Sequence, residues 1–455
     1  MSERNSKLTE LDNAGKIFPA QNTDTWSNVF RVGMELKEDI DPVILKTALD
    51  RTLARLPGFK VKMKKGALWY SFEENHEECP VSCDVSNFCY RINFNEHNGY
   101  LFRVFYFGRK ISLDVYHALC DGYGAVVFLC TLAGEYLRLK GYGISYNELV
   151  LDVEDNPKQE ETEDSYKRYA SSDLKSTYPS DWVYHRRGAK LPEHMTNYTV
   201  GTMSFRQLHE LSKNYGVTVT ELLAAVMLEV NYKKMLSECK GRKKVSVQIP
   251  VNLRKAFPSR TLRNFVLCLR VQLEPREEEY SFEEMLDCAS KQLRSVNKPE
   301  ILNSMMTKNV RMEKQAAAYV PLALKNLFIG IGFQITAEKS TTALISNLGP
   351  IRLPDDMAEH IEKCFFYTGP GMVNGARCGV ASFGDKLTFS FSNCFKEGDV
   401  EREFFLKLKS MGVDISVETN RSTAEALRWS ELFDNVDCEA FSEKLYTSTG
   451  KARIR

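Results

Sequence analysis

Near residue 120 the spacing of apolar residues changes from that of a strand to that of a helix. Ile111, Leu113 and Val115 alternate with more polar residues, which is the pattern of a half-buried strand. His117 has the same parity, so it is predicted to point toward the apolar, inward face. A helix is predicted to begin just after Gly122. Its apolar stripe consists of Ala125, Phe128, Leu129, Leu132 and Tyr136.

Strand and helix signals alternate along the rest of the chain, which indicates an α/β protein. Asp41-Pro42 is typical of a helix start, with Asp as cap and Pro in the first turn. Two hairpins are predicted, one joining 101–107 to 111–117 and one turning at Gly384-Asp385. Three further helix starts have capping-box spacing: Ser204 with Gln207, Thr218 with Glu221, and Ser281 with Glu284. Strand faces are predicted at Val245, Val247 and Ile249 and at Phe265, Leu267, Leu269 and Val271.

The clearest candidate boundary is an acidic stretch in which apolar periodicity disappears. Seven acidic residues stand against Lys158 alone between Asp152 and Asp164. We therefore predict an N-terminal lobe over 1–155, a solvated crossover linker over 156–195 and a C-terminal lobe over 196–455. The linker contains a basic pair, Arg186 and Arg187, for which a surface charge run is favoured over phosphate binding.

The segment from His117 to Gly122 reads His-x-x-x-Asp-Gly and carries the most specific chemistry in the chain. A neutral imidazole can take a proton from a hydroxyl, amine or thiol at pH 7. Asp121 can fold back under the turn, where pairing with an Arg is favoured over contact with substrate. Gly122 permits an unusual backbone conformation or a close approach. On the motif alone, a buried histidine with a purely structural role stays open.

The motif does not stand alone. The segment Tyr116 to Gly122 resembles the His-His-x-x-x-Asp-Gly signature of one acyltransferase superfamily, with Tyr116 in place of the first histidine. That superfamily includes chloramphenicol acetyltransferase, alcohol acetyltransferases, polyketide-associated acyltransferases and the condensation domains of peptide synthetases. The resemblance spans about residues 15–420, and the alcohol acetyltransferase branch is the most similar. The other similar stretches are Ile249 to Arg254, Arg263 to Val266, Ser346 to Gly349 and Leu387 to Ser392.

The resemblance implies an architecture and a mechanism. Two α/β lobes with mixed sheets would enclose a central tunnel, with His117 as general base at its middle. Arg254 would pair with Asp121, although a solvent-facing arginine is the alternative. Ser346 and Asn347 would line the tunnel or stabilise the oxyanion, although their composition alone also fits a simple turn.

Three functions follow from the resemblance. The first is transfer of an acyl group, with acetyl expected, from acyl-CoA to a small-molecule acceptor in a ternary complex. An alcohol is the expected acceptor and an amine the lesser alternative. The second is condensation of carrier-protein-bound substrates, and the third is ligand binding without catalysis. The intact His117, Asp121 and Gly122 argue against the third. Acyl-CoA would be a co-substrate, no bound cofactor is expected, and the residues that bind the CoA phosphates are not identified.

Composition fits this reading. The chain has 455 residues, 43% hydrophobic content and a formal net charge of +1, so its totals give no reason to expect binding to nucleic acid or an anionic membrane. It shows neither an apolar run of about 20 residues nor an apolar signal sequence, so a cytoplasmic protein is expected, with an amphipathic surface helix left open. The seven histidines are scattered, so no metal site is expected. Among the 12 cysteines, Cys120 is interpreted as structural rather than nucleophilic.

Overall fold

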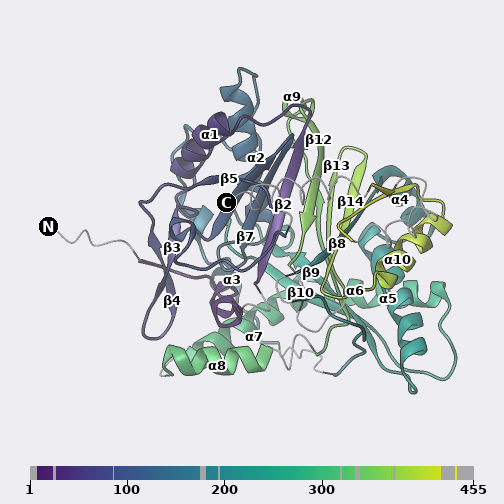
Figure 1. The fold of residues 1–455 in the computed structure, drawn as a ribbon. Coiled ribbons are helices and arrows are strands. Elements are labelled where there is room, and N and C mark those ends of the chain that lie inside the picture. The colour runs from purple at the N-terminus through teal and green to yellow at the C-terminus, as the bar shows by residue number, and fades with distance from the viewer. Residues whose placement is uncertain are drawn as a thin grey trace.

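The computed structural model describes residues 8–23, 27–85, 87–174, 181–192, 195–317, 320–333, 339–369, 371, 376–421 and 436–437. Its buried apolar side chains form two separate cores, one in each of two lobes that lie side by side (Figure 1). The prediction of a two-lobed α/β fold with mixed sheets is confirmed.

The N-terminal lobe is built around a five-stranded sheet with the order β12-β2-β7-β6-β5. Helices α1 and α2 pack against each other, and α2 packs on β2 and β7. A small sheet, β1-β4-β3, lies beside it. The elements are β1 (Leu8–Glu10), β2 (Val29–Leu36), α1 (Pro42–Arg55), β3 (Val61–Lys65), β4 (Tyr70–Glu74), β5 (Val81–Cys83), β6 (Phe102–Phe107), β7 (Lys110–Tyr116), α2 (Gly122–Leu139), α9 (Asp355–Ala358) and β12 (Ile361–Tyr367).

The C-terminal lobe has an eight-stranded sheet with the order β10-β9-β11-β13-β14-β8-β15-β16. Helices α5, α6 and α10 pack together beside it (Figure 1). The strands are β8 (Asn197–Ser204), β9 (Val245–Asn252), β10 (Val266–Leu273), β11 (Ala343–Pro350), β13 (Ala376–Phe383), β14 (Lys386–Asn393), β15 (Ile415–Thr419) and β16 (Val436–Asp437). The helices are α4 (Phe205–Asn214), α5 (Val219–Glu238), α6 (Phe282–Val296) and α10 (Asp399–Ser410).

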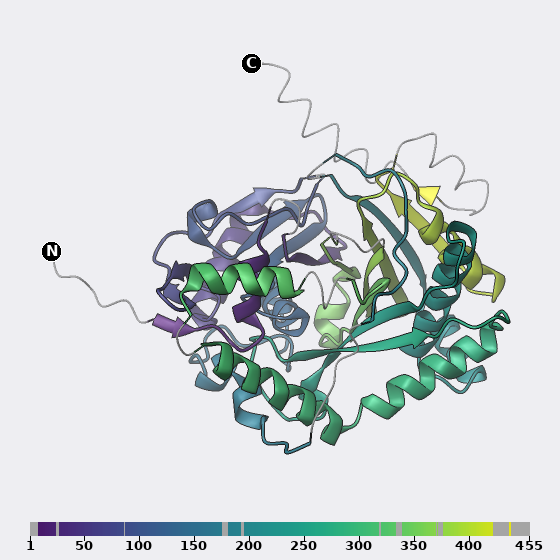
Figure 2. The ribbon, with the colours of Figure 1, turned by 90° about the horizontal axis from the view of Figure 1, so that it is seen from below.

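The remaining helices lie outside the two large sheets, and α7 and α8 are at the bottom of the molecule in the view of Figure 1. Among them, α8 crosses the N-terminal part of the molecule and packs on η1 (Figure 2), while α3 packs on α7. Their bounds are α3 (Ser165–Tyr169), α7 (Pro299–Ala317) and α8 (Leu322–Phe333), with the short 3₁₀ helices η1 (Gly15–Gln21), η2 (His97–Gly99), η3 (Gln159–Thr162) and η4 (Leu253–Lys255).

Strand β12 joins the two lobes. It pairs with β2 in the N-terminal sheet although it follows most of the C-terminal lobe in the chain. On its other side, Thr388 Oγ1 and Ser390 Oγ of β14 donate hydrogen bonds to the carbonyls of Cys364 and Phe366, at 3.0 and 2.5 Å. The predicted boundary at 156–195 therefore assigns most strands to the correct sheet. The exception is β12, which follows the boundary in the chain but belongs to the N-terminal sheet.

Local signals for helix starts agree with the structure. The Asp41 carboxylate accepts hydrogen bonds from two backbone N–H groups of α1. Thr218 and Ser281 begin α5 and α6 with complete capping boxes, and Ser204 caps α4 through its hydroxyl. The hairpins β6–β7 and β13–β14 are confirmed as well.

The prediction that the strand before His117 is half-buried was wrong, because β7 is buried on both faces. Asp114 lies on the face predicted to be solvated, and it accepts a hydrogen bond from the Arg31 guanidinium. Asp84 pairs with the same guanidinium at 2.8 Å, and Arg103 lies 3.3 Å from Asp114. This buried cluster of opposite charges lets polar residues occupy the interior.

The acidic crossover is only partly solvated, which corrects the prediction for 156–195. Glu161 is buried and forms a two-pronged ion pair with the Arg55 guanidinium, with N–O distances of 2.7 and 2.8 Å. The buried Tyr166 hydroxyl donates to the Val266 carbonyl at 2.7 Å and accepts from the Val266 N–H at 2.9 Å. The first part of the crossover therefore contacts both lobes.

At Gly379, strand β13 lies so close to β12 that even one added methyl group should be destabilising. A Cβ atom there would lie 2.3 Å from the Phe366 carbonyl oxygen, which belongs to the backbone of β12. We expect Gly379→Ala to lower the free energy of unfolding by about 1–3 kcal/mol, as overpacking usually does. Gly143→Ala is the matched control, since a Cβ at Gly143 meets nothing within 4 Å. Equal urea midpoints for the two variants would contradict the close approach of β12 and β13.

Candidate active site

The candidate site lies where β7 ends and α2 begins. The His117 N–H continues the ladder of β7 by donating to the Asn28 carbonyl at 2.9 Å. Asp121 then caps α2, because its carboxylate accepts from the Gly124 N–H at 3.1 Å. Helix α2 begins at Gly122 itself, one residue earlier than predicted.

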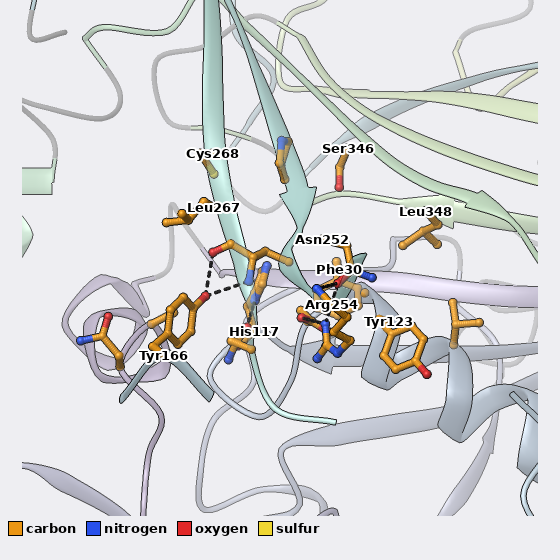
Figure 3. A pocket seen from close by; sticks show the side chains of 18 of the residues that line it. Phe30, His117, Tyr123, Tyr166, Asn252, Arg254, Leu267, Cys268, Ser346 and Leu348 are labelled. Carbon is orange, nitrogen blue, oxygen red and sulfur yellow. Dashed lines mark hydrogen bonds and ion pairs between the residues drawn. The ribbon is translucent and has the colours of Figure 1, made fainter. Parts of the chain in front are cut away.

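A cavity of about 1450 Å³ surrounds the end of this turn. Its lining includes His117 and Tyr123 from the N-terminal lobe and Asn252, Cys268 and Ser346 from the C-terminal lobe (Figure 3). A ligand in this space would contact both lobes. Large cavities lined by both apolar and polar side chains are the usual binding sites for small molecules.

The imidazole of His117 is held from three sides. Its Nδ1 lies 2.9 Å from the Asn264 Oδ1. The ring stacks on Phe18 at a centroid distance of 4.6 Å and meets the edge of Phe30 at 5.1 Å. Burial lowers the pKa of His117 below its ordinary value. At neutral pH the ring is therefore uncharged and able to accept a proton.

The Asp121 carboxylate ties three segments of the chain together. It pairs with the Arg254 guanidinium at 2.8 Å and accepts from the Phe265 N–H at 2.8 Å, in addition to capping α2. Only 1% of Asp121 is exposed. The structure thus places Arg254 against Asp121, as the sequence suggested, and the solvent-facing alternative for Arg254 does not hold.

Arg254 itself binds the loop that leads into β10. Its guanidinium donates to the carbonyls of Thr261 and Arg263 at 2.7–3.0 Å and lies 4.6 Å from the centre of the Tyr123 ring. The role of Gly122 is a close approach, because a Cβ there would lie 2.4 Å from Leu348 Cδ2. Its backbone is not in the left-handed region.

Ser346 and Asn347 lie in β11 rather than in a free turn, and both line the cavity. The Ser346 hydroxyl points toward the pocket (Figure 3). The Asn347 amide already has partners at both ends, since its Nδ2 donates to Thr220 Oγ1 at 3.0 Å and its Oδ1 accepts from the Gly349 N–H at 2.8 Å. Of the two candidates, Ser346 is therefore better placed to meet a ligand.

The two basic residues of the crossover, Arg186 and Arg187, have different environments in the structure. Arg186 is buried, pairs with Asp399 and donates to the Glu397 carbonyl at 2.7 Å, so it is not placed to bind a phosphate. Arg187 is exposed. Neither is among the described residues that line the cavity.

Cys120 is fully buried, and burial raises the pKa of its thiol well above the ordinary range. Within the described part of the chain, the cavity lining includes His117 and Asp121 but not Cys120. A thiol in this position lacks the thiolate character that a nucleophile needs.

Among the described residues, no group of three or more His, Cys, Asp or Glu side chains is arranged to hold a metal ion. No helix in those ranges has both the length and the apolar character to cross a membrane.

Sequence reasoning missed the side chains that hold the imidazole. Asn264 lies in the stretch Arg263 to Val266, which is similar to the acyltransferase superfamily, but the sequence indicated no role for it. Asp12, whose carboxylate accepts from Asn264 Nδ2 at 3.0 Å, lies before the part of the chain that the resemblance covers. Phe18 follows it in η1, where no periodic pattern marks it.

Comparison with solved structures identifies the fold. Polyketide synthase associated protein 5 from Mycobacterium tuberculosis matches with a TM-score of 0.57 and 15% identity, over 89% of this chain and 97% of that one. F. graminearum TRI101 complexed with ethyl coenzyme A matches with a TM-score of 0.56 and 12% identity, over 89% and 97%. The chain has the chloramphenicol acetyltransferase-like fold.

Condensation domains match this fold as well. The starter condensation domain of rhizomide synthetase RzmA, in complex with C8-CoA, gives a TM-score of 0.54 and 11% identity over 89% of this chain and 94% of that one. No protein-family model matches the chain, and neither does any curated protein sequence. The similarity is therefore one of fold, and the function depends on the residues of the site.

From the buried ion pair between Asp121 and Arg254 we predict that Asp121→Asn destabilises the protein. The Arg254 guanidinium would be left without its buried partner, which usually costs about 3–5 kcal/mol. We expect a lower melting temperature, measured by circular dichroism, together with loss of site geometry. Asp50→Asn is the control, because it breaks an exposed pair with Lys46 and should cost at most about 1 kcal/mol. An unchanged melting temperature with a specific loss of rate would instead place Asp121 in contact with the reacting groups.

Proposed function

We propose that the protein is an acyltransferase that moves an acyl group from an acyl-CoA thioester to an alcohol, with His117 as general base. The observation that carries this proposal is the placement of an uncharged, rigidly held imidazole in a large cavity between two lobes. Such a cavity can bind donor and acceptor at the same time. The CoA derivatives in the complexes of TRI101 and of the RzmA domain support a thioester donor.

The reaction follows from the position of the imidazole. His117 Nε2, the ring nitrogen that Asn264 does not engage, removes the proton from the acceptor hydroxyl as its oxygen attacks the thioester carbonyl. A carbon–oxygen bond forms, and the tetrahedral intermediate then breaks its carbon–sulfur bond. The imidazolium returns its proton to the departing thiolate, so ester and free CoA leave and His117 is neutral again.

Two other features of the cavity contribute to the rate. The Ser346 hydroxyl is the proposed donor to the oxyanion of the tetrahedral intermediate, a contribution worth roughly 10²–10³-fold for a single donor. Holding both substrates in one cavity removes much of the entropic cost of bringing them together. Asn347 would position the strand that carries Ser346, because its amide is bound to Thr220 and Gly349.

Acetyl-CoA is the proposed donor and an alcohol the proposed acceptor, as the alcohol acetyltransferase branch suggests. Condensation of carrier-protein-bound substrates is the second candidate, favoured by the similarity to condensation domains. The two share a thioester on a phosphopantetheine arm and differ in what holds that arm. Thiol release from acyl-CoAs of increasing length, tested against a panel of alcohols and amines, separates them from each other and from ligand binding without turnover.

The mechanism predicts that His117→Ala loses roughly 10²–10⁴-fold in turnover while its melting temperature stays close to that of the parent, because a general base contributes that much. Released CoA thiol is the measurement. Cys120→Ala is the matched control on the same turn and should keep most of the activity. Incubation with acyl-CoA alone should leave no acyl group on the protein by mass spectrometry. Near-normal turnover of His117→Ala, or an acyl adduct on Cys120 that transfers to acceptor, would contradict the mechanism.

A further inference from the structure

Two side chains outside the His-x-x-x-Asp-Gly motif connect the imidazole of His117 to the N-terminal segment of the chain. Asn264 lies just before β10 and Asp12 lies just before η1, and both are buried. Asn264 contacts His117 Nδ1 through its Oδ1 at 2.9 Å and the Asp12 Oδ2 through its Nδ2 at 3.0 Å. The three groups form one continuous hydrogen-bonded chain.

The chemistry of its partners fixes which way the Asn264 amide points. Its nitrogen lies 3.0 Å from the His117 carbonyl oxygen and 3.0 Å from the Asp12 carboxylate. A carbonyl oxygen and an ionised carboxylate can only accept hydrogen bonds, so the amide NH₂ has to face them. The amide oxygen then faces His117 Nδ1. Because that oxygen can only accept, Nδ1 has to carry the proton.

We propose that Asp12 and Asn264 are a positioning pair that holds His117 as the Nδ1–H tautomer and leaves Nε2 free to act as the base. The assignment of the tautomer stands on contacts alone, and its catalytic consequence rests on the acyl transfer proposed above. Oxygen Oδ1 of Asn264 remains an acceptor when the ring gains a second proton, so the same contact serves both states of the catalytic cycle.

The Asp12 carboxylate is itself rigidly bound, which gives the pair a fixed geometry. It accepts from the Gly15 N–H at 2.7 Å, the Asn264 N–H at 3.3 Å and the Asn264 Nδ2. Burial raises the pKa of Asp12 to about 6, so the carboxylate is still largely ionised at pH 7.5. An ionised Asp12 cannot donate, and it therefore keeps the Asn264 amide from turning over.

A neutral amide between the carboxylate and the ring also governs the charge of His117. The charged groups that face the imidazole are Asp121, which favours the imidazolium, and Arg377, which opposes it. Those that face Asp12 are Asp164 and Arg263. A carboxylate directly beside Nδ1 would favour the imidazolium strongly, whereas an amide orients the ring without adding a charge. The site thus keeps a base that is free at neutral pH.

The tautomer can be measured without substrate, by nitrogen-15 NMR of the full chain with labelled histidine. The His117 signals are identified by their loss in His117→Gln. We expect a protonated Nδ1 and an unprotonated Nε2 at pH 7.5, with a titration midpoint below that of a free histidine. A protonated Nε2 with a bare Nδ1 would overturn the proposal whatever the activity of the protein.

Exchanging the two residues, in the double variant Asp12→Asn with Asn264→Asp, tests the charge argument. The links from His117 Nδ1 to position 264 and from position 264 to position 12 are kept, the hydrogen bond to the His117 carbonyl is lost, and the negative charge moves next to Nδ1. We expect the midpoint of His117 to rise by roughly 1 unit or more. The acidic limb of kcat/KM should rise with it, so that activity at pH 6 falls relative to pH 8, because only the neutral ring is a base. Asp164→Asn is the control, since it removes a charge near Asp12 without touching Asn264 or His117, and it should leave the midpoint in place. An unchanged midpoint in a folded double variant would refute the proposal.

Kinetics separate a failure of this proposal from a failure of the proposed function. Asn264→Ala should lose roughly 10²-fold in kcat with little change in KM, because a misplaced base costs rate rather than binding. If His117→Ala is inactive while Asn264→Ala keeps normal kcat, the general base stands and the positioning pair is refuted. If His117→Ala keeps its activity, the proposed mechanism fails. The NMR measurement still shows, independently of activity, whether Asn264 holds His117 as the Nδ1–H tautomer.

Discussion

The carboxylate of Asp121 is the interaction on which the site depends, because it joins the two lobes at the point where chemistry is proposed. It receives a hydrogen bond from the start of α2 in the N-terminal lobe. It also receives one from the Phe265 N–H and an ion pair from Arg254, both in the C-terminal lobe. A buried carboxylate is stable only when its lone pairs are occupied, so the lobes must meet in one arrangement to satisfy it. That arrangement brings His117 to the cavity lined by both lobes.

The distribution of charge around the site has a simple logic. Two buried carboxylates close to the imidazole have partners of their own, with Asp121 bound to Arg254 and Asp12 bound to Asn264. The imidazole itself meets a neutral amide and two aromatic rings. Burial then lowers the pKa of His117, and the ring stays uncharged without losing its orientation.

Local features of the fold could be predicted from sequence, and contacts between distant segments could not. The turn after β7, the cap of α1 and the capping boxes of α5 and α6 depend on residues a few positions apart, and their patterns indicated them correctly. The face of β7 that carries Asp114 was predicted to be solvated, because Arg31, the buried partner of Asp114, lies far away in the chain. The pairing of β12 with β2, and that of Asp12 with Asn264, likewise join segments about 250 residues or more apart and leave no periodic signal. The family resemblance indicated Arg254 because it supplied such a long-range pairing.

The central claim is that a thioester donor meets acceptor beside His117 Nε2, in the cavity between the lobes. A crystal structure with a non-reactive alkyl-CoA thioether tests it most directly, since the sulfur marks where the scissile bond lies. The account predicts sulfur in the cavity, within about 4 Å of Nε2 or one water molecule away, as proton return to the thiolate requires. A thioether bound outside the cavity, or with its sulfur on the far side of Phe30 from the imidazole, would contradict it.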